Sequence, residues 1–389
     1  MKTYVEFQRG DWMKILYVTT IGTTMGFFKS FIKKLTDDGN QVELACNNSA
    51  NVPEFYVENG FKIHSIDCSR APLNKGNLKA VMQLKKIVEN GHFDIVHCHT
   101  PIAAACCRIA CRKARKNGTK VIYTAHGFHF YKGAPFINWL VYYPIEKICS
   151  HFTDVLITIN TEDYALAQKK MKAKSILYVP GVGIDTEKFT NCTLSSDEKN
   201  SLRKEMGVPF DAKLLVSVGE LNENKNHQVV LKAISMLNYS NIHYAVAGRG
   251  NKSDDLTELA KKLGISDQFH LLGYRNDIAQ IYKSSDICCF PSIREGLGLA
   301  AIEGMAAGLP LIAADNRGTR DFCQNGVNGF MCDPFSPQDF ADAISKLLND
   351  NCLCARMGNQ NTNDVKKFDI NIVNNHMLEI YNELSRKEN

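Results

Sequence analysis

The sequence has no long apolar run, and this absence excludes one large class of proteins. Nowhere in its 389 residues do about 18 or more apolar residues follow one another without interruption, as a membrane-spanning helix requires. The start, MKTYVEFQRGDWMKILYV, lacks the pattern of a cleavable signal peptide. We therefore expect a protein that is soluble or peripheral to a membrane.

A strong charge imbalance is also missing. The formal net charge is +5, from 46 basic and 41 acidic residues. Such a small excess does not by itself argue for nucleic acid, and we expect no nucleic-acid partner. No internal repeat of short period and no low-complexity tract is evident in the sequence.

Cysteine is plentiful, but no C-x-x-C pair occurs. The 14 cysteines fall inside apolar segments, as Cys106, Cys107, Cys288 and Cys289 illustrate. Free cysteine behaves as a small buried hydrophobe, and disulfides are rare in reducing compartments. We therefore expect buried free thiols and a cytoplasmic location.

Length and pattern predict two α/β domains. The chain exceeds the roughly 250–300 residues at which single cores stop growing. Strand-like and helical segments alternate in both halves, which indicates parallel sheets with helices on both faces. A polar stretch, TNCTLSSDEKNSLRKEMG, precedes the second series, and we place the boundary near Asp185 to Thr190. The expected strands are KILYVTT, VELAC, DIVHCH, KVIYTAH, VLITIN and ILYVPG, then KLLVSVGE, HYAVAGRG, QFHLLGY, SSDICCFPS and PLIAAD.

The segment EGLGLAAIE indicates what the chain binds. It lies between the strand-like SSDICCFPS and the short helix AAIEGMAAG, so its glycines occupy a strand-to-helix turn. Backbone N–H groups and the helix dipole at such a turn attract an anion, and glycine lets a phosphate approach closely. The flanking Glu295 and Glu303 can accept hydrogen bonds from sugar hydroxyls. Phosphate together with a polyol predicts a nucleotide sugar, contacted at Gly296, Leu297, Gly298 and Leu299.

A rival interpretation of the same residues is a dinucleotide fingerprint. Gly296, Gly298 and Ala301 fit GxGxxA, and Asp315 follows about 20 residues on, as a ribose-binding acid should. The fingerprint usually opens its domain, whereas at least three strand–helix units precede it here, which disfavours a dehydrogenase. A third possibility is that the segment binds no ligand, the glycines serving only helix packing and the two glutamates lying in solvent.

The wider pattern resembles a known family. VSVGELNENKNHQVVLKAI, AVAGRGN and the run from LGYRNDIAQIYKSSD to NGFMCDP are similar to the C-terminal half of glycosyltransferase family 4, roughly from Leu214 to Pro334. FDIVHCHTP, TAHGFHFYKGAP and VPGVGIDTEKF resemble its capsular and exopolysaccharide branch. The resemblance implies a retaining enzyme with the GT-B fold, in which two Rossmann-like domains face a cleft. We expect an acceptor-side domain at 1–187, a nucleotide-sugar domain at 188–365, and a terminal helix at 366–389 that packs back toward the first domain.

Four residues match the catalytic and donor-binding positions of this family. Lys225 matches the lysine aimed at the donor diphosphate, whose growing charge an active site must stabilise. Glu295 matches the donor-sugar ligand and Glu303 the ribose ligand. His126 matches a histidine near the reacting sugar, where neutral imidazole can bind a hydroxyl.

Three further positions complete the predicted site. Where the family usually has arginine after the glycine that matches Gly219, this chain has Glu220, which leaves open whether Arg294 or another arginine supplies the charge. Arg275 lies in a loop that borders the nucleobase in relatives. Gly22 follows the first strand, where its N–H group would cover a phosphate or simply form a loop.

We expect neither a cofactor nor a catalytic metal. His97 and His99 alternate on a strand and suggest a metal pair, but no third ligand is evident. GT-B enzymes also lack the acidic metal triad of other transferases.

The resemblance implies transfer of a sugar, with N-acetylhexosamine as one candidate, from a UDP-linked donor to a polyprenyl-diphosphate-linked saccharide in capsule or exopolysaccharide synthesis. A GT-B nucleotide-sugar epimerase and a catalytically silent subunit of a transferase pair are the alternatives. Joint retention of Lys225, Glu295, Glu303 and His126 argues against the silent subunit, and the extent of the resemblance argues against the epimerase.

One local excess of aromatic residues indicates where the protein works. Twenty-one positions hold eight of the 36 aromatic residues, where an even spread would place about two. Core packing explains Tyr123, but KGAPFINWLVYYPIEK has the lysines and the Trp and Tyr rings that favour lipid headgroups. We expect this domain to dock on the cytoplasmic membrane face, helped by an upstream basic cluster. The aromatics are Tyr123, Phe128, Phe130, Tyr131, Phe136, Trp139, Tyr142 and Tyr143, and the cluster is Arg108, Arg112, Lys113, Arg115, Lys116 and Lys120.

Overall fold

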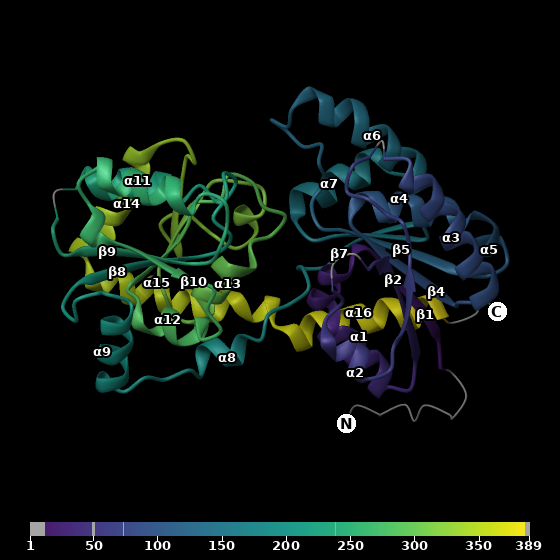
Figure 1. Ribbon diagram of the computed structural model, residues 1–389, viewed down its shortest axis with the longest axis horizontal. Helices are drawn as coiled ribbons and strands as arrows, with labels where there is room; N and C mark the ends of the chain where they lie inside the picture. The colour runs from purple at the N-terminus through teal and green to yellow at the C-terminus, as the bar shows by residue number, and fades with distance from the viewer. Residues whose placement is uncertain (1–11, 49–50, 73, 238, 386–389) are drawn as a thin grey trace. The chain divides into compact units, whose positions relative to one another are not determined.

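The computed structural model describes residues 12–48, 51–72, 74–237 and 239–385, which divide into two compact units (Figure 1). Unit 1 extends to Val182 and resumes at Ile372, and unit 2 runs from Gly183 to Asn371. Residues 1–11 and 386–389 lie outside the described residues. The prediction that the start lacks a signal peptide and the outer ends of the predicted domains fall there.

Unit 1 is built on a seven-stranded parallel sheet with the order β3-β2-β1-β4-β5-β6-β7. Successive side chains of β1 point to opposite faces, so Leu16 and Val18 enter one hydrophobic core while Ile15 and Tyr17 enter another. Both faces are therefore buried, as is usual for parallel sheets. The strands are β1 (Lys14–Ile21), β2 (Gln41–Asn47), β3 (Lys62–Ser65), β4 (Ile95–His99), β5 (Lys120–Ala125), β6 (Val155–Thr158) and β7 (Ser175–Tyr178).

Helices cover both faces of this sheet (Figure 1). One core takes its helical side chains mainly from α3, α4 and α7, and the other from α1, α2 and the last helix of the chain. These elements are η1 (Gly22–Phe28), α1 (Lys29–Asp37), α2 (Glu54–Glu58), α3 (Gly76–Gly91), α4 (Pro101–Ala110), α5 (Arg112–Lys116), α6 (Phe136–Ser150) and α7 (Thr161–Lys170).

The last helix, α16 (Ile370–Ser385), belongs to unit 1 although it ends the chain. Val373, Met377 and Tyr381 recur every four residues and so lie on one face, which is buried in the core. The Tyr381 hydroxyl donates a hydrogen bond to the Tyr17 hydroxyl (3.2 Å), and thus α16 contacts β1 directly.

Unit 2 repeats the topology with a six-stranded parallel sheet ordered β10-β9-β8-β11-β12-β13. The strands are β8 (Lys213–Val218), β9 (Ile242–Ala247), β10 (Phe269–Gly273), β11 (Ile287–Phe290), β12 (Leu311–Ala314) and β13 (Gly329–Cys332). The helices are α8 (Thr186–Thr190), α9 (Ser196–Glu205), α10 (His227–Ser235), α11 (Ser253–Lys262), η2 (Ser266–Gln268), α12 (Ile278–Ser284), α13 (Leu299–Ala306), η3 (Thr319–Asp321), α14 (Pro337–Asn349), α15 (Asn351–Asp364) and η4 (Val365–Phe368).

All expected strands are present, but two further strands were not expected from the sequence. β3 and β13 each have four residues and lie at an edge of their sheet. Half-buried edge strands carry little of the apolar signal on which strand prediction depends, and no residue of β3 is fully buried.

All 14 cysteines are free thiols, which confirms the expectation for Cys106, Cys107, Cys288 and Cys289, all of them buried. Cys352 is exposed, and Cys192 and Cys354 are only partly buried, so for these three residues the expected burial is wrong. In the described part of the chain, no helix combines the length and the apolar character needed to cross a bilayer.

Candidate functional site

The strand order of unit 2 places its candidate site. The chain winds outward from β8 in one direction through β9 and β10, and from β11 in the other direction through β12 and β13. The carboxyl ends of β8 and β11 are therefore the point where the strand order reverses, and ligands of open α/β sheets bind at such points. The loop after β8 carries Lys225, and the loop after β11 carries Glu295.

Lys225 and Glu295 form an ion pair at this point. The Lys225 ammonium nitrogen lies 2.7 Å from Glu295 Oε1, and both side chains are partly exposed. The same ammonium is 5.4 Å from the centre of the Phe290 ring, which the last residue of β11 supplies. Two predicted site residues that are 70 positions apart in the sequence are thus in direct contact.

Three asparagines that were not singled out from the sequence hold the loop after β8 in place. Asn222 Oδ1 accepts a hydrogen bond from the Lys225 backbone N–H (3.0 Å). Asn224 Nδ2 donates to the Arg294 carbonyl (2.9 Å), and Asn226, in the left-handed conformation at φ 52°, donates to the Pro334 carbonyl (2.7 Å). The recurrence of asparagine in LNENKN was the available signal, because asparagine tolerates this conformation and bonds to nearby backbone.

The glycine turn lies between β11 and α13, the strand-to-helix position expected from the sequence. Gly298 adopts φ 110°, and a Cβ atom there would lie 2.8 Å from the Phe290 ring. Only glycine fits both constraints. Leu297 beside it is buried, and α13 begins at Leu299.

Glu303 lies in the middle of α13 and is mostly buried. Burial raises the pKa of its carboxyl group to about 7, although the Lys188 ammonium opposes the shift. A carboxyl group that titrates near neutral pH is uncommon and often marks a functional position.

Three arginines of unit 2 differ in their contacts and in their exposure. The Arg275 guanidinium bonds to Asp277 (2.8 Å to Oδ1) and pairs with Glu205, and these carboxylates raise its pKa. Arg294 is exposed. Arg317, which the sequence analysis missed, is buried, and its Nε donates to the Glu295 carbonyl (3.3 Å).

The structure does not favour the dinucleotide interpretation. Its glycines follow β11, whereas a dinucleotide fingerprint follows the first strand of its domain. Asp315, the proposed ribose ligand, is paired with Arg320 (2.7 Å).

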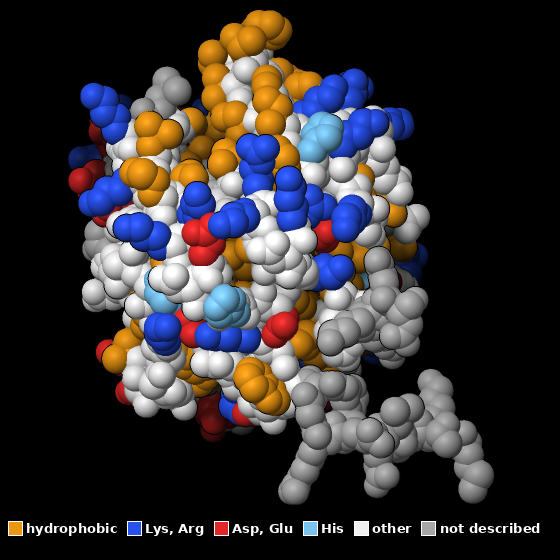
Figure 2. Space-filling model, turned by 90° about the vertical axis from the view of Figure 1, so that its right-hand side faces the viewer, with side chains coloured by type: hydrophobic (Ala, Val, Ile, Leu, Met, Phe, Trp, Pro, Cys, Tyr) orange, Lys and Arg blue, Asp and Glu red, His pale blue; other side chains and the backbone are white. Residues whose placement is uncertain are grey.

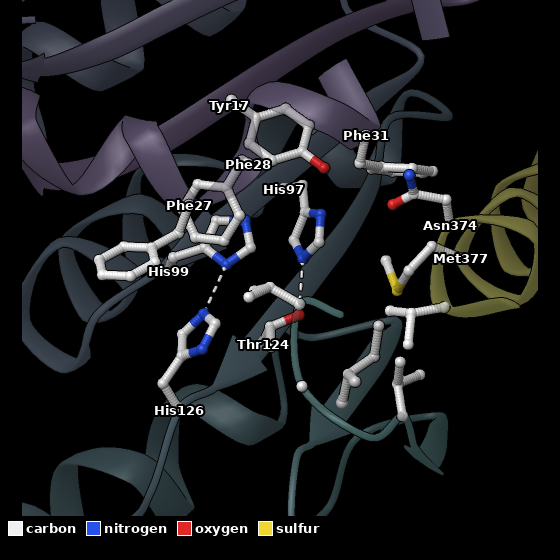
Figure 3. Close-up of a pocket in the computed structure, with 15 residues that line it drawn as sticks. Tyr17, Phe27, Phe28, Phe31, His97, His99, Thr124, His126, Asn374 and Met377 are labelled. Atoms are coloured by element: carbon white, nitrogen blue, oxygen red, sulfur yellow. Dashed lines mark hydrogen bonds between the residues drawn. The ribbon is translucent and has the colours of Figure 1, made fainter. Parts of the chain in front are cut away.

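Unit 1 has a pocket at its own reversal point, between β1 and β4 (Figure 3). His126, just after β5, lies with its Nε2 3.1 Å from His99 Nδ1. His97 bonds to the Tyr381 hydroxyl (2.6 Å) and to Thr124 Oγ1 (2.8 Å). The sequence indicates the pair of His97 and His99, but not that His126 joins them. The pocket is completed by Tyr17, Phe27, Phe28, Phe31, Ile157, Val179, Gly181, Val182, Val373, Asn374 and Met377.

Burial keeps these imidazoles neutral. It lowers the pKa of His126 to about 4, and burial with neighbouring imidazoles lowers the pKa values of His97 and His99 well below their usual range. His99 Nε2 is buried without a hydrogen-bond partner. No group of three or more metal-ligating side chains is found within residues 12–48, 51–72, 74–237 and 239–385.

The loop that holds Gly22 forms the 3₁₀ helix η1. Gly22 is buried at its first position, while Phe27 and Phe28 near its end line the pocket. Phe28 stacks on His99 with ring centres 4.0 Å apart.

The predicted basic cluster is wrong for Arg108. Its side chain has no exposed surface and forms a buried ion pair with Glu146 (2.8 Å). Arg115 is also engaged, with two nitrogens bonded to Asp154. A run of cations in the sequence does not reveal that some of them point inward.

Two family models match the chain. "Glycosyl transferases group 1" matches residues 198–364, and "Glycosyl transferase 4-like" matches residues 14–160. A protein named "Putative glycosyltransferase EpsD" from Bacillus subtilis (strain 168) is 38% identical over 372 residues, which cover 95% of this chain and 96% of that protein.

Two further relatives extend the comparison. The Escherichia coli enzyme "UDP-Gal:alpha-D-GlcNAc-diphosphoundecaprenol alpha-1,3-galactosyltransferase" is 27% identical over 345 residues, covering 86% of this chain and 87% of the enzyme. Among solved structures, Anabaena HepE in complex with UDP and glucose superposes with a TM-score of 0.79 at 20% identity, covering 95% of this chain and all of HepE. The prediction of a GT-B fold with two Rossmann-like parallel-sheet domains is confirmed.

Proposed function

The chain belongs to the group 1 glycosyl transferases, and from this premise we propose that it moves a sugar from a UDP-linked donor to a polyprenyl-diphosphate-linked saccharide. We further propose retention of anomeric configuration, a role in capsule or exopolysaccharide synthesis, and N-acetylhexosamine as the first donor sugar to test. Two comparisons support the substrates. The name of the Escherichia coli relative specifies a UDP-linked donor and a diphosphoundecaprenol-linked acceptor, and the HepE complex contains UDP.

The main structural support for this proposal is the ion pair between Lys225 and Glu295. Negative charge grows on the diphosphate as it leaves, and a preorganised cation lowers the energy of that state. An ammonium has three N–H donors, so Lys225 can hold Glu295 and still bind a phosphate oxygen. Glu295, fixed by Lys225 at 2.7 Å, then accepts a hydrogen bond from the donor sugar.

Each remaining predicted residue has a proposed supporting role within its own unit. The diphosphate approaches the backbone N–H groups of the turn from Gly296 to Leu299, where α13 begins. Neutral His126, fixed by His99, hydrogen-bonds a sugar hydroxyl. We propose that Arg294 and Gly22 contact phosphate. We propose that Arg275, which forms ion pairs with Glu205 and Asp277, contacts the nucleobase.

Glu303 is proposed to bind the ribose, and this role predicts a pH dependence. Hydroxyl groups donate to the ionised carboxylate, so nucleotide binding favours loss of a proton from a group whose pKa is about 7. We expect UDP to bind about tenfold more weakly at pH 6 than at pH 8. The Glu303 carboxyl group is mostly ionised at pH 8 and mostly protonated at pH 6. Isothermal titration calorimetry across this range measures the affinity.

The Glu303→Gln variant is the control, because UDP itself titrates in the same range. The variant should bind UDP more weakly at pH 8 and lose the part of the pH dependence that Glu303 causes. Equal pH slopes for the two proteins would contradict the ribose role.

The reaction itself is tested by product analysis. The protein is incubated with UDP-, GDP- and dTDP-sugars and a polyprenyl-diphosphate-linked saccharide, and the products are separated by mass and linkage. Transfer to the acceptor supports the proposal, whereas isomerisation of the donor would indicate an epimerase, and an unchanged donor would indicate a silent subunit.

We expect transfer to survive chelation. No acidic metal triad is evident in the sequence, and Lys225 is positioned to neutralise the leaving diphosphate without a metal. The rate in EDTA should stay within about twofold of the rate in Mg²⁺, since the cationic side chain supplies the charge stabilisation. Loss of activity in EDTA with recovery in Mg²⁺ or Mn²⁺ would overturn this expectation.

A further inference from the structure

The helix α6 exposes an apolar stripe to solvent. Phe136, Leu140 and Ile148 are 79%, 60% and 60% exposed, and Ile137 beside them is 59% exposed. Spacings of four and eight residues place the first three on one face of the helix. Burying such side chains in a core is the usual outcome, so a row of them at the surface requires an explanation.

The aromatic excess in this region divides into two groups. Phe128 and Phe130 are buried in the core with Tyr123, as core packing predicts, and Trp139 packs partly against them. Phe136, by contrast, is directed to solvent. Figure 2 shows hydrophobic side chains gathered over α6 at the top of this face, with Lys and Arg side chains beneath and beside them.

The exposed charges of α6 and of the segment that leads into it are of one sign. Lys132 precedes the helix, and Lys147 lies 5.6 Å from the Tyr143 ring near its end. The only carboxylate within Phe136–Ser150 is Glu146, which is buried against Arg108 and so adds no negative charge to the surface. The exposed side of α6 is therefore apolar and cationic, which complements an anionic lipid surface.

Buried contacts fix this face in place. The Arg108–Glu146 ion pair ties α6 to α4, and Glu146 Oε1 also accepts a hydrogen bond from the Tyr123 hydroxyl (3.0 Å). Trp139 Nε1 donates to the Tyr131 carbonyl (3.2 Å). A helix held in this way cannot simply turn its apolar stripe inward.

We infer that the exposed face of α6, defined by Phe136, Ile137, Leu140 and Ile148 with Lys132 and Lys147, docks on the headgroup region of an anionic phospholipid membrane. The inference rests on the proposed function, because a polyprenyl-linked acceptor is met at a bilayer. It narrows the docking surface expected from the sequence to the exposed face of α6, and it no longer uses the upstream basic cluster, in which Arg108 is buried.

Flotation of the full chain with vesicles tests the inference. Phosphatidylcholine vesicles that contain phosphatidylglycerol should carry the protein upward, and pure phosphatidylcholine vesicles should carry less. Phe136→Ser with Leu140→Ser should lower partitioning by about 10- to 100-fold, since two large side chains no longer enter the lipid. Lys132→Gln with Lys147→Gln should lower it about tenfold on the anionic vesicles alone.

A matched control comes from unit 2. Phe210 and Phe335 are each 73% exposed, so Phe210→Ser with Phe335→Ser removes comparable apolar surface away from α6 and should leave flotation unchanged. Thermal melting and UDP binding verify that each variant is folded.

Three results would overturn the inference. The first is that the natural chain does not float, and the second is that Phe136→Ser with Leu140→Ser floats as well as the natural chain. The third is that this variant still floats but no longer self-associates, which would show that α6 binds a second copy of the chain. Flotation needs neither donor nor acceptor, so its failure is separable from failure of the transfer assay.

Discussion

Replacing Lys225 with alanine is expected to lower the turnover number by about 10²- to 10³-fold, while the KM for the donor changes only a few-fold. The charge that Lys225 meets on the diphosphate grows as the glycosidic bond breaks, so its contribution is larger in the transition state than in the ground state. Glu295→Ala should act in the same direction, because it removes the carboxylate that holds the ammonium at 2.7 Å. Steady-state kinetics with varied donor concentration measure both parameters.

Two variants make this test specific. Lys262→Ala removes an ion pair of the same 2.7 Å length from the exposed surface of α11, and it should leave turnover unchanged. Lys225→Met keeps most of the apolar stem but removes the ammonium group near Phe290, and it should be nearly as impaired as the alanine variant if charge is what matters. An increase in donor KM with normal turnover would show that Lys225 only binds the donor.

The sequence predicted the two halves of this site but not their contact. Alternating strands and helices indicate parallel sheets, and the glycine turn lies between β11 and α13, at the strand-to-helix position that the sequence indicates. The pairing of Lys225 with Glu295, however, depends on β8 lying beside β11, which the strand order decides and no local pattern encodes. Asn224 and Asn226 were missed for the same reason, since their partners are supplied by distant loops.

The pocket of unit 1 shows a second limit of prediction from sequence. His97 and His99 were noticed because they alternate on one strand, but His126 reaches them only because β5 lies next to β4. Tyr381 comes from the opposite end of the chain and could not have been assigned to His97 by spacing. The low pKa values of these histidines follow from that burial and so were equally hidden.

The error at Arg108 leads to a large expected effect on stability. Burial alone would lower the pKa of Arg108, but the Glu146 carboxylate raises it above its ordinary value, so the guanidinium stays charged inside unit 1. We expect Glu146→Gln to reduce the free energy of unfolding by about 3–5 kcal/mol, because it leaves that buried charge without its counter-ion. Urea denaturation followed by circular dichroism measures the loss.

Two further variants separate loss of a counter-ion from loss of packing. Arg108→Met with Glu146→Leu removes both charges and keeps apolar volume, so it should recover most of the stability that Glu146→Gln loses. Asp37→Asn breaks the exposed Lys33–Asp37 pair and should cost less than about 0.5 kcal/mol, as surface ion pairs do. If the double variant is no more stable than Glu146→Gln, packing around the pair rather than its charge stabilises α6. Arg108→Met with Glu146→Leu should float with vesicles as well as the natural chain does, because neither residue belongs to the exposed face of α6.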